Sequence, residues 1–103
     1  MTIVESTRQA IGGMQHIERA IIEQVRARNG EITAANFRWN NGAPFVPLPP
    51  DVIPMHVRLG SRQARVAWSR TQIEDSWERL DRWEVRQEIE RVVNELVPKK
   101  SAS

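Results

Sequence analysis

The chain has 103 residues, of which 40% are hydrophobic and 27% charged, a balance typical of one small globular domain. It contains no cysteine, which excludes disulfides, thiolate catalysis and cysteine-ligated metal centres. No apolar run approaches the roughly 20 residues that span a bilayer, and no basic leader precedes an apolar run. We therefore expect a cytoplasmic protein without membrane contact, with one domain over residues 1–98 and a disordered tail over 99–103.

The net charge of +2 is unevenly distributed along the chain. Residues 36–70 carry five arginines against one aspartate, whereas residues 71–103 carry eight acidic residues against six basic ones. Either the acidic C-terminal part neutralises the basic middle inside the molecule, or the basic surface faces an external anion. The sequence leaves both arrangements open.

The first predicted element is a helix over residues 6–28. Ser6 or Thr7 is expected to cap its N-terminus, and Asn29-Gly30 to end it, with Gly30 in the left-handed conformation. Hydrophobic residues mainly three or four positions apart predict one buried stripe, formed by Ile11, Met14, Ile17, Ile21, Ile22 and Val25. The pair Gly12-Gly13 weakens the prediction for the first turns.

A strand is predicted over residues 32–39, with Phe37 and Trp39 on one face and Arg38 on the other. Asn40-Asn41-Gly42 marks a turn. Residues 44–54 contain five of the six prolines, so we expect this segment to run extended along the surface or a sheet edge. Its expected role is a stiff connector that pins Phe45 and Val46 to the core, and a polyproline ligand is the alternative.

Residues 55–68 read as a β-hairpin with a turn at residues 60–63. Apolar residues alternate in both strands, so we expect them to share the core face, with Leu59 opposite Ala64, Val57 opposite Val66 and Met55 opposite Trp68. The other face then carries His56, Arg58, Arg65 and Ala67. In this register Arg58 lies directly across from Arg65, a mildly unfavourable pairing that an acidic side chain or an external anion would offset.

A C-terminal helical segment follows the hairpin. Ser69 and Gln72 predict a capping box, and Ile73, Trp77 and Leu80 an apolar edge. Asp81 and Glu84 form a second, looser box, which predicts a kink or a restart. The last helix is expected over residues 82–97, ended by Pro98, with a buried stripe of Val85, Ile89, Val92, Val93 and Leu96.

Four arginines are the candidate contacts for an anion or a nucleic acid: Arg38, Arg58, Arg62 and Arg65. Among the tryptophans, Trp68, Trp77 and Trp39 are expected in the core. Trp83 lies off the main stripe of the last helix, so we expect it to be exposed and to mark a partner interface.

The remaining polar residues give little support for chemistry. His16 and His56 lack the spacing of metal ligands, and we expect both at the surface. Neither Ser69 nor Ser76 has a base partner in the sequence, and the acidic Glu74, Asp75 and Glu78 read as a solvated helix face. No cofactor motif is present, so we expect neither an enzyme nor a bound cofactor or metal.

The element order of helix, three strands and helix is similar to that of double-stranded-RNA-binding domains. Those domains grip phosphates with lysines at the start of the last helix, a position where this chain has Asp81-Arg82-Trp83-Glu84. The expected fold is α+β, a three-stranded, mainly antiparallel sheet with the helices packed on one face.

The expected function is a small non-enzymatic binding or regulatory protein that contacts a protein partner or a second copy of itself. The sheet edge and the proline-rich segment would be natural contact sites. The alternative is a nucleic-acid-binding domain that uses the arginine-bearing hairpin face.

Overall fold

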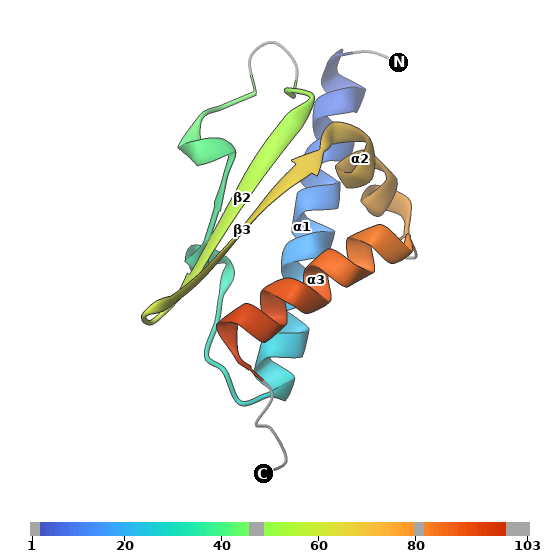
Figure 1. The fold of residues 1–103 in the computed structure, drawn as a ribbon. Coiled ribbons are helices and arrows are strands. Elements are labelled where there is room, and N and C mark those ends of the chain that lie inside the picture. The colour runs from blue at the N-terminus through green and yellow to red at the C-terminus, as the bar shows by residue number, and fades with distance from the viewer. Residues whose placement is uncertain (1–2, 46–48, 80–81, 99–103) are drawn as a thin grey trace.

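The computed structural model describes residues 3–45, 49–79 and 82–98; the predicted tail, Val46, Leu80 and Asp81 lie outside this part. In chain order the elements are helix α1 (Ile3–Ala27), the 3-10 turn η1 (Ala34–Asn36), strand β1 (Phe37–Trp39), the 3-10 turn η2 (Asn40–Gly42), strands β2 (Val52–Leu59) and β3 (Arg62–Ser69), and helices α2 (Arg70–Glu78) and α3 (Trp83–Leu96). The strands form one antiparallel sheet in the order β1-β2-β3, and the helices lie on one side of it (Figure 1). This is the predicted α+β fold.

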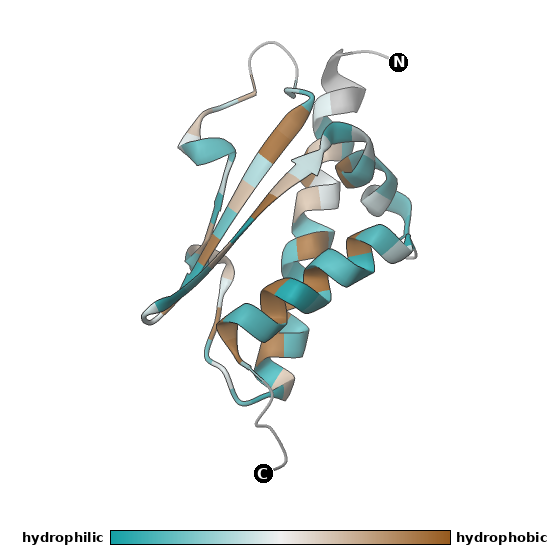
Figure 2. Cartoon of the chain, in the orientation of Figure 1, coloured by the Kyte–Doolittle hydropathy of each residue, from teal (hydrophilic) through white to brown (hydrophobic). Residues whose placement is uncertain are grey.

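The core lies between the sheet and the helices. The side chains expected to point inward from the hairpin do so: Val57, Val66 and Trp68 are buried, and Leu59 packs against them at the edge of the core. All five hydrophobic residues predicted for the last helix are buried too. Figure 2 shows hydrophobic and hydrophilic residues alternating along β2 and along α3, as elements with one covered face require.

Helix α1 is longer than predicted and ends differently. It begins at Ile3, so Ser6 and Thr7 lie within its first turns and not at its cap. Asn29, with a φ of 65°, takes the left-handed position expected of Gly30, whose N–H bonds the Val25 carbonyl at 3.0 Å. Ile11 is 43% exposed and does not belong to the buried stripe.

Gly12 and Gly13 lie inside α1, where α2 crosses it, so they do not weaken its first turns. A Cβ atom on Gly12 would lie 1.8 Å from the Trp77 ring, and one on Gly13 would lie 1.8 Å from the Ile73 carbonyl oxygen. Only a residue without a Cβ allows the two helices to approach this closely. The low helix propensity of the pair is therefore overridden by tertiary packing.

The hairpin turn is shorter than predicted. Gly60 and Ser61 alone connect β2 to β3, and Gly60 has a φ of 63°, which suits the first position of a two-residue hairpin turn. The predicted register is therefore wrong by two residues. Leu59 pairs with Arg62, Val57 with Ala64, Met55 with Val66 and Ile53 with Trp68. A shift of two keeps every side chain on its predicted face.

The first strand is confined to three residues. Ile32 is buried, but residues 34–36 form a 3-10 turn that a capping box between Thr33 and Asn36 stabilises. The turn predicted at residues 40–42 is present, with positive φ at all three positions. Phe45 packs against the core, as expected of the connector.

Pro54 lies in the central strand and not along a sheet edge as predicted. Strand β1 pairs only with Met55–Val57, so at Pro54 the sheet is two strands wide. The Arg65 carbonyl oxygen accepts a hydrogen bond from Arg91 and therefore points away from β2. The carbonyl oxygen of Ala67, two residues further along β3, points in the same direction and does not face β2. Its partner Pro54 therefore has no acceptor to serve on β3, and the N–H that proline lacks is not needed there.

The two C-terminal helices differ in how their N-termini are capped. The Ser69 hydroxyl accepts from the Gln72 N–H at 3.1 Å, and the Gln72 side chain accepts from the Ser69 N–H at 3.0 Å, so the predicted capping box is confirmed. The predicted restart before the last helix is also present, but Arg82 occupies the N-cap position and its side chain makes no capping bond.

Candidate functional site

The outer face of the sheet, opposite the helices, carries Arg38, Arg58 and Arg65, and all three side chains are exposed. Arg38 in β1 pairs with His56 in β2, which in turn pairs with Arg65 in β3. One residue of each strand thus contributes to a transverse row of three basic side chains. Adjacent strands lie about 4.8 Å apart, so the two arginines of the row have Cα atoms about 10 Å apart. Arg58 follows His56 two positions along β2 on the same face.

The register removes the like-charged pair expected across the hairpin. Arg58 lies opposite Gln63, and Arg65 lies opposite His56. The His56 Nε2 lies 2.9 Å from the Gln63 side-chain oxygen, which accepts a hydrogen bond when that nitrogen is protonated. His56 is consequently oriented between two arginines. Sequence reasoning treated this histidine as an isolated surface residue, because only the pairing with both neighbouring strands places it in the row.

Arg62 does not belong with the other three arginines. It pairs with Leu59, which packs on the core, so its side chain leaves the sheet on the helix side. Its Nη1 donates to the Glu95 carbonyl oxygen near the end of α3 at 3.4 Å. The predicted group of four is therefore divided into three residues on the outer face and one on the inner rim.

The charges of the outer face have no internal partner among the described residues. Ion pairs among the described residues include those of Arg70 with Asp51 and Glu74, of Arg82 with Asp75 and Glu84, and of Arg91 with Glu88 and Glu95. The hydrogen bond to Glu88 raises the pKa of Arg91 above its ordinary value. These carboxylates of α2 and α3 thus pair with arginines beside them, and the sheet separates them from its outer face.

A shallow hollow of about 520 Å³ opens on the outer face beside the row. Its lining includes Arg38, His56 and Arg65, the strand residues Pro54, Met55, Val66 and Ala67, and Asn41 from the η2 turn. The hollow therefore combines apolar strand residues with two positively charged arginines.

Of the tryptophans, Trp83 is the most exposed, at 63%, which confirms its predicted exposure. Trp68 is buried as expected, and its indole N–H has no hydrogen-bond partner in the part of the chain described. Trp39 is half-buried, and its indole N–H donates to the Glu18 carboxylate at 2.6 Å. Burial raises the pKa of Glu18, and this hydrogen bond partly offsets the effect.

Trp77 is 39% exposed, so its expected place in the core is wrong. Its ring stacks on His16, with ring centroids 5.6 Å apart and 12° between the planes. The reason is the narrow crossing of α1 and α2, where the Trp77 ring covers Gly12 instead of entering the core. His16 is partly buried, not fully at the surface, and its Nδ1 lies 2.9 Å from the Ser76 carbonyl oxygen.

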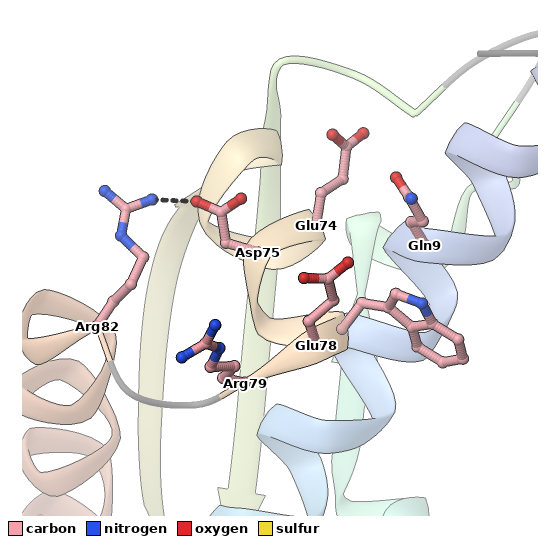
Figure 3. A pocket seen from close by; sticks show the side chains of 7 residues that line it. Gln9, Glu74, Asp75, Glu78, Arg79 and Arg82 are labelled. Atoms are coloured by element: carbon pink, nitrogen blue, oxygen red, sulfur yellow. Dashed lines mark hydrogen bonds and ion pairs between the residues drawn. The ribbon is translucent and has the colours of Figure 1, made fainter.

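A second hollow, of about 420 Å³, lies on the helix side and is lined by Gln9, Glu74, Asp75, Trp77, Glu78, Arg79 and Arg82 (Figure 3). Arg82 donates to Asp75 at 2.6 Å across its rim. Acidic and basic side chains are mixed around this hollow, in contrast to the outer face of the sheet. It gives no preference for a ligand of either charge.

The two serines considered as nucleophiles, Ser69 and Ser76, form hydrogen bonds with the backbone. Ser69 caps α2, and the buried Ser76 hydroxyl donates to the Gln72 carbonyl oxygen at 2.7 Å. Within the described ranges, no group of three or more histidine, aspartate or glutamate side chains is arranged to hold a metal ion. No helix in those ranges is both long enough and apolar enough to span a bilayer.

No family model matches the chain, and neither a curated protein nor a solved structure shows significant similarity to it. The resemblance in element order to double-stranded-RNA-binding domains gains no support from these comparisons.

Proposed function

We propose that this protein is a small non-enzymatic binding protein whose partner presents negative charge to the outer face of the sheet. The observation that carries the proposal is that Arg38, Arg58 and Arg65 share this face without an ion pair to any described carboxylate. Like charges gathered on one exposed surface repel one another, and an anionic partner relieves that repulsion.

The form of the surface also supports binding. The positive residues stand on paired strands, which hold their Cα positions more rigidly than loops would. The helices cover only the opposite side of the sheet, so a large partner has free access (Figure 1). We further propose a cytoplasmic location.

A polyanion without bases or peptide groups tests this proposal. The probe is heparin, and the readout is the salt concentration that elutes the protein from a heparin column. We expect the triple variant R38Q/R58Q/R65Q to elute at clearly lower salt than the wild-type protein. The control is R8Q/R19Q/R86Q, which removes three exposed arginines of α1 and α3 and changes the net charge by the same amount.

The control variant should elute close to the wild-type protein. Equal losses in both triple variants would mean that retention depends on net charge alone, and the proposal would fail. Circular dichroism checks that each variant keeps its secondary structure, which we expect because all six side chains are exposed.

A second candidate is contact with a protein partner or another copy of the chain through Trp83. The supporting observation is its 63% exposure at the start of α3, because large exposed indoles are frequent anchors of protein interfaces. Sedimentation at high micromolar concentration tests self-association: an oligomer that Trp83→Ala dissociates would support it. A monomeric wild-type protein would remove self-association, and unchanged oligomers of the variant would remove Trp83 as the contact.

A further inference from the structure

We infer that the outer face binds the phosphodiester backbone of a double-helical nucleic acid, without reading its bases. This inference rests on the proposed function and names the partner of the same surface. The contacts are the guanidinium groups of Arg38, Arg58 and Arg65, with the hollow beside the row receiving a backbone phosphate.

The chemistry of the charged groups favours phosphate. A guanidinium group donates two parallel hydrogen bonds to the oxygens of one phosphate, and arginine is favoured over lysine where such bidentate contacts form. All three cations of the outer face are arginines. His56 adds a further donor or acceptor between two of them.

The absence of phenylalanine, tyrosine and tryptophan from the outward positions of the described strands favours a duplex over a single strand. In the described strands, the residues that face outward are Arg38, Val52, Pro54, His56, Arg58, Gln63, Arg65, Ala67 and Ser69. None of them is phenylalanine, tyrosine or tryptophan, because Phe37 and Trp39 point towards the helices and pack on the core. Proteins that bind single strands combine positive charge with aromatic platforms for the bases. In a duplex the bases stack on one another, so phosphate contacts suffice.

The shape of the surface favours contact without base recognition. The face is a sheet whose strands lie side by side, and the helices α1, α2 and α3 lie on its other side (Figure 1). Reading bases in the major groove requires a helix or a two-stranded ribbon that enters the groove. The row of Arg38, His56 and Arg65 lies where all three strands are paired, which makes the surface wider than such a ribbon. A broad face with arginines roughly 10 Å apart can instead contact phosphates on the outside of the duplex.

The number of arginines sets the expected salt dependence. Each neutralised phosphate of B-DNA contributes about −0.9 to the slope of the logarithm of the association constant against the logarithm of salt concentration. Three contacts give a slope of about −2.7, which is a loss of about 40-fold in affinity between 50 and 200 mM salt.

Fluorescence anisotropy with a labelled 20-base-pair DNA duplex measures this slope. We expect about −2.7 for the wild-type protein, and a slope reduced by about 0.9 in each of R38Q, R58Q and R65Q. Arg62→Gln is the matched control within the same hairpin, because Arg62 leaves the sheet on the helix side. Its slope should equal that of the wild-type protein, and duplexes of unrelated sequence should bind within about threefold of one another.

Three results would overturn the inference: no duplex binding at 50 mM salt, tighter binding of the separated single strands than of the duplex, or an equal change of slope in R62Q and R65Q. The heparin experiment separates the two levels of the proposal. Heparin binding that depends on the three arginines, without duplex binding, would leave the proposed function standing and refute the nucleic-acid partner. If the protein bound neither heparin through the three arginines nor the duplex, both the proposed function and the nucleic-acid partner would be refuted.

Discussion

Replacing Gly13 with alanine sets helix propensity against tertiary packing. In an isolated helix the change stabilises by about 1 kcal/mol. In this fold the new Cβ would lie 1.8 Å from the Ile73 carbonyl oxygen, whereas ordinary contact begins at 3.4 Å, so α2 would have to retreat by about 1.6 Å. The obstacle is backbone, which cannot turn aside as the end of a side chain can.

The loss of stability follows from the packing around Ile73 that this retreat of α2 would weaken. Ile73 is completely buried, and burying an isoleucine contributes about 1.5–3 kcal/mol, while a gap of 0.5–1 Å already forfeits a quarter to half of the dispersion attraction. Adding overpacking strain of about 1–3 kcal/mol and subtracting the propensity gain gives a net loss of about 1–3 kcal/mol. A domain of this size should then melt about 5–20 °C lower.

Urea unfolding of Gly13→Ala, Gly12→Ala and Gln15→Ala measures the effect. We expect Gly12→Ala to be milder, because its Cβ would meet the Trp77 ring, which is partly exposed and can move. Gln15 is an exposed position of the same helix and serves as the control for propensity alone. A Gly13→Ala protein as stable as the wild type, or more stable, would refute the proposed close crossing of α1 and α2.

Two further predictions concern stability. Glu18→Gln keeps an oxygen that can accept a hydrogen bond from Trp39 but removes the cost of a partly buried charge. Because the folded-state pKa of Glu18 is raised, the wild-type protein should lose stability relative to this variant as pH rises from about 4.5 through that raised pKa, and a constant difference from pH 4 to 7 would contradict this. Ser69→Ala should lower the free energy of unfolding by about 1 kcal/mol, because the Gln72 N–H loses its acceptor, and thermal denaturation that leaves Tm unchanged would contradict the role of the cap.

The sequence was informative where local interactions decide the structure. The Ser69–Gln72 capping box and the buried stripe of α3 depend on residues three or four positions apart, and the structure confirms both. The division of outward arginines from inward apolar residues in the hairpin also followed from alternation alone.

The errors arose in how one strand pairs with another. A hairpin shifted by two residues keeps the same faces, so alternation could not distinguish Arg58 opposite Arg65 from Arg58 opposite Gln63. The predicted turn was also two residues too long, so Arg62 was expected in the turn and not in β3, where it shares the inner face with Leu59. The row of Arg38, His56 and Arg65 depends on pairing between all three strands and could not be seen in any one of them.

The crossing of α1 with α2 has a consequence for the order in which the protein folds. The hydrogen-bonded pair His16 and Ser76 is 60 residues apart in sequence, whereas the β2–β3 hairpin and the start of α2 are contiguous. During synthesis α1 leaves the ribosome before the hairpin, but the residues that cover its glycines emerge only after both long strands. Closing so large a loop is entropically costly, so the hairpin can form early, before α1 packs against α2.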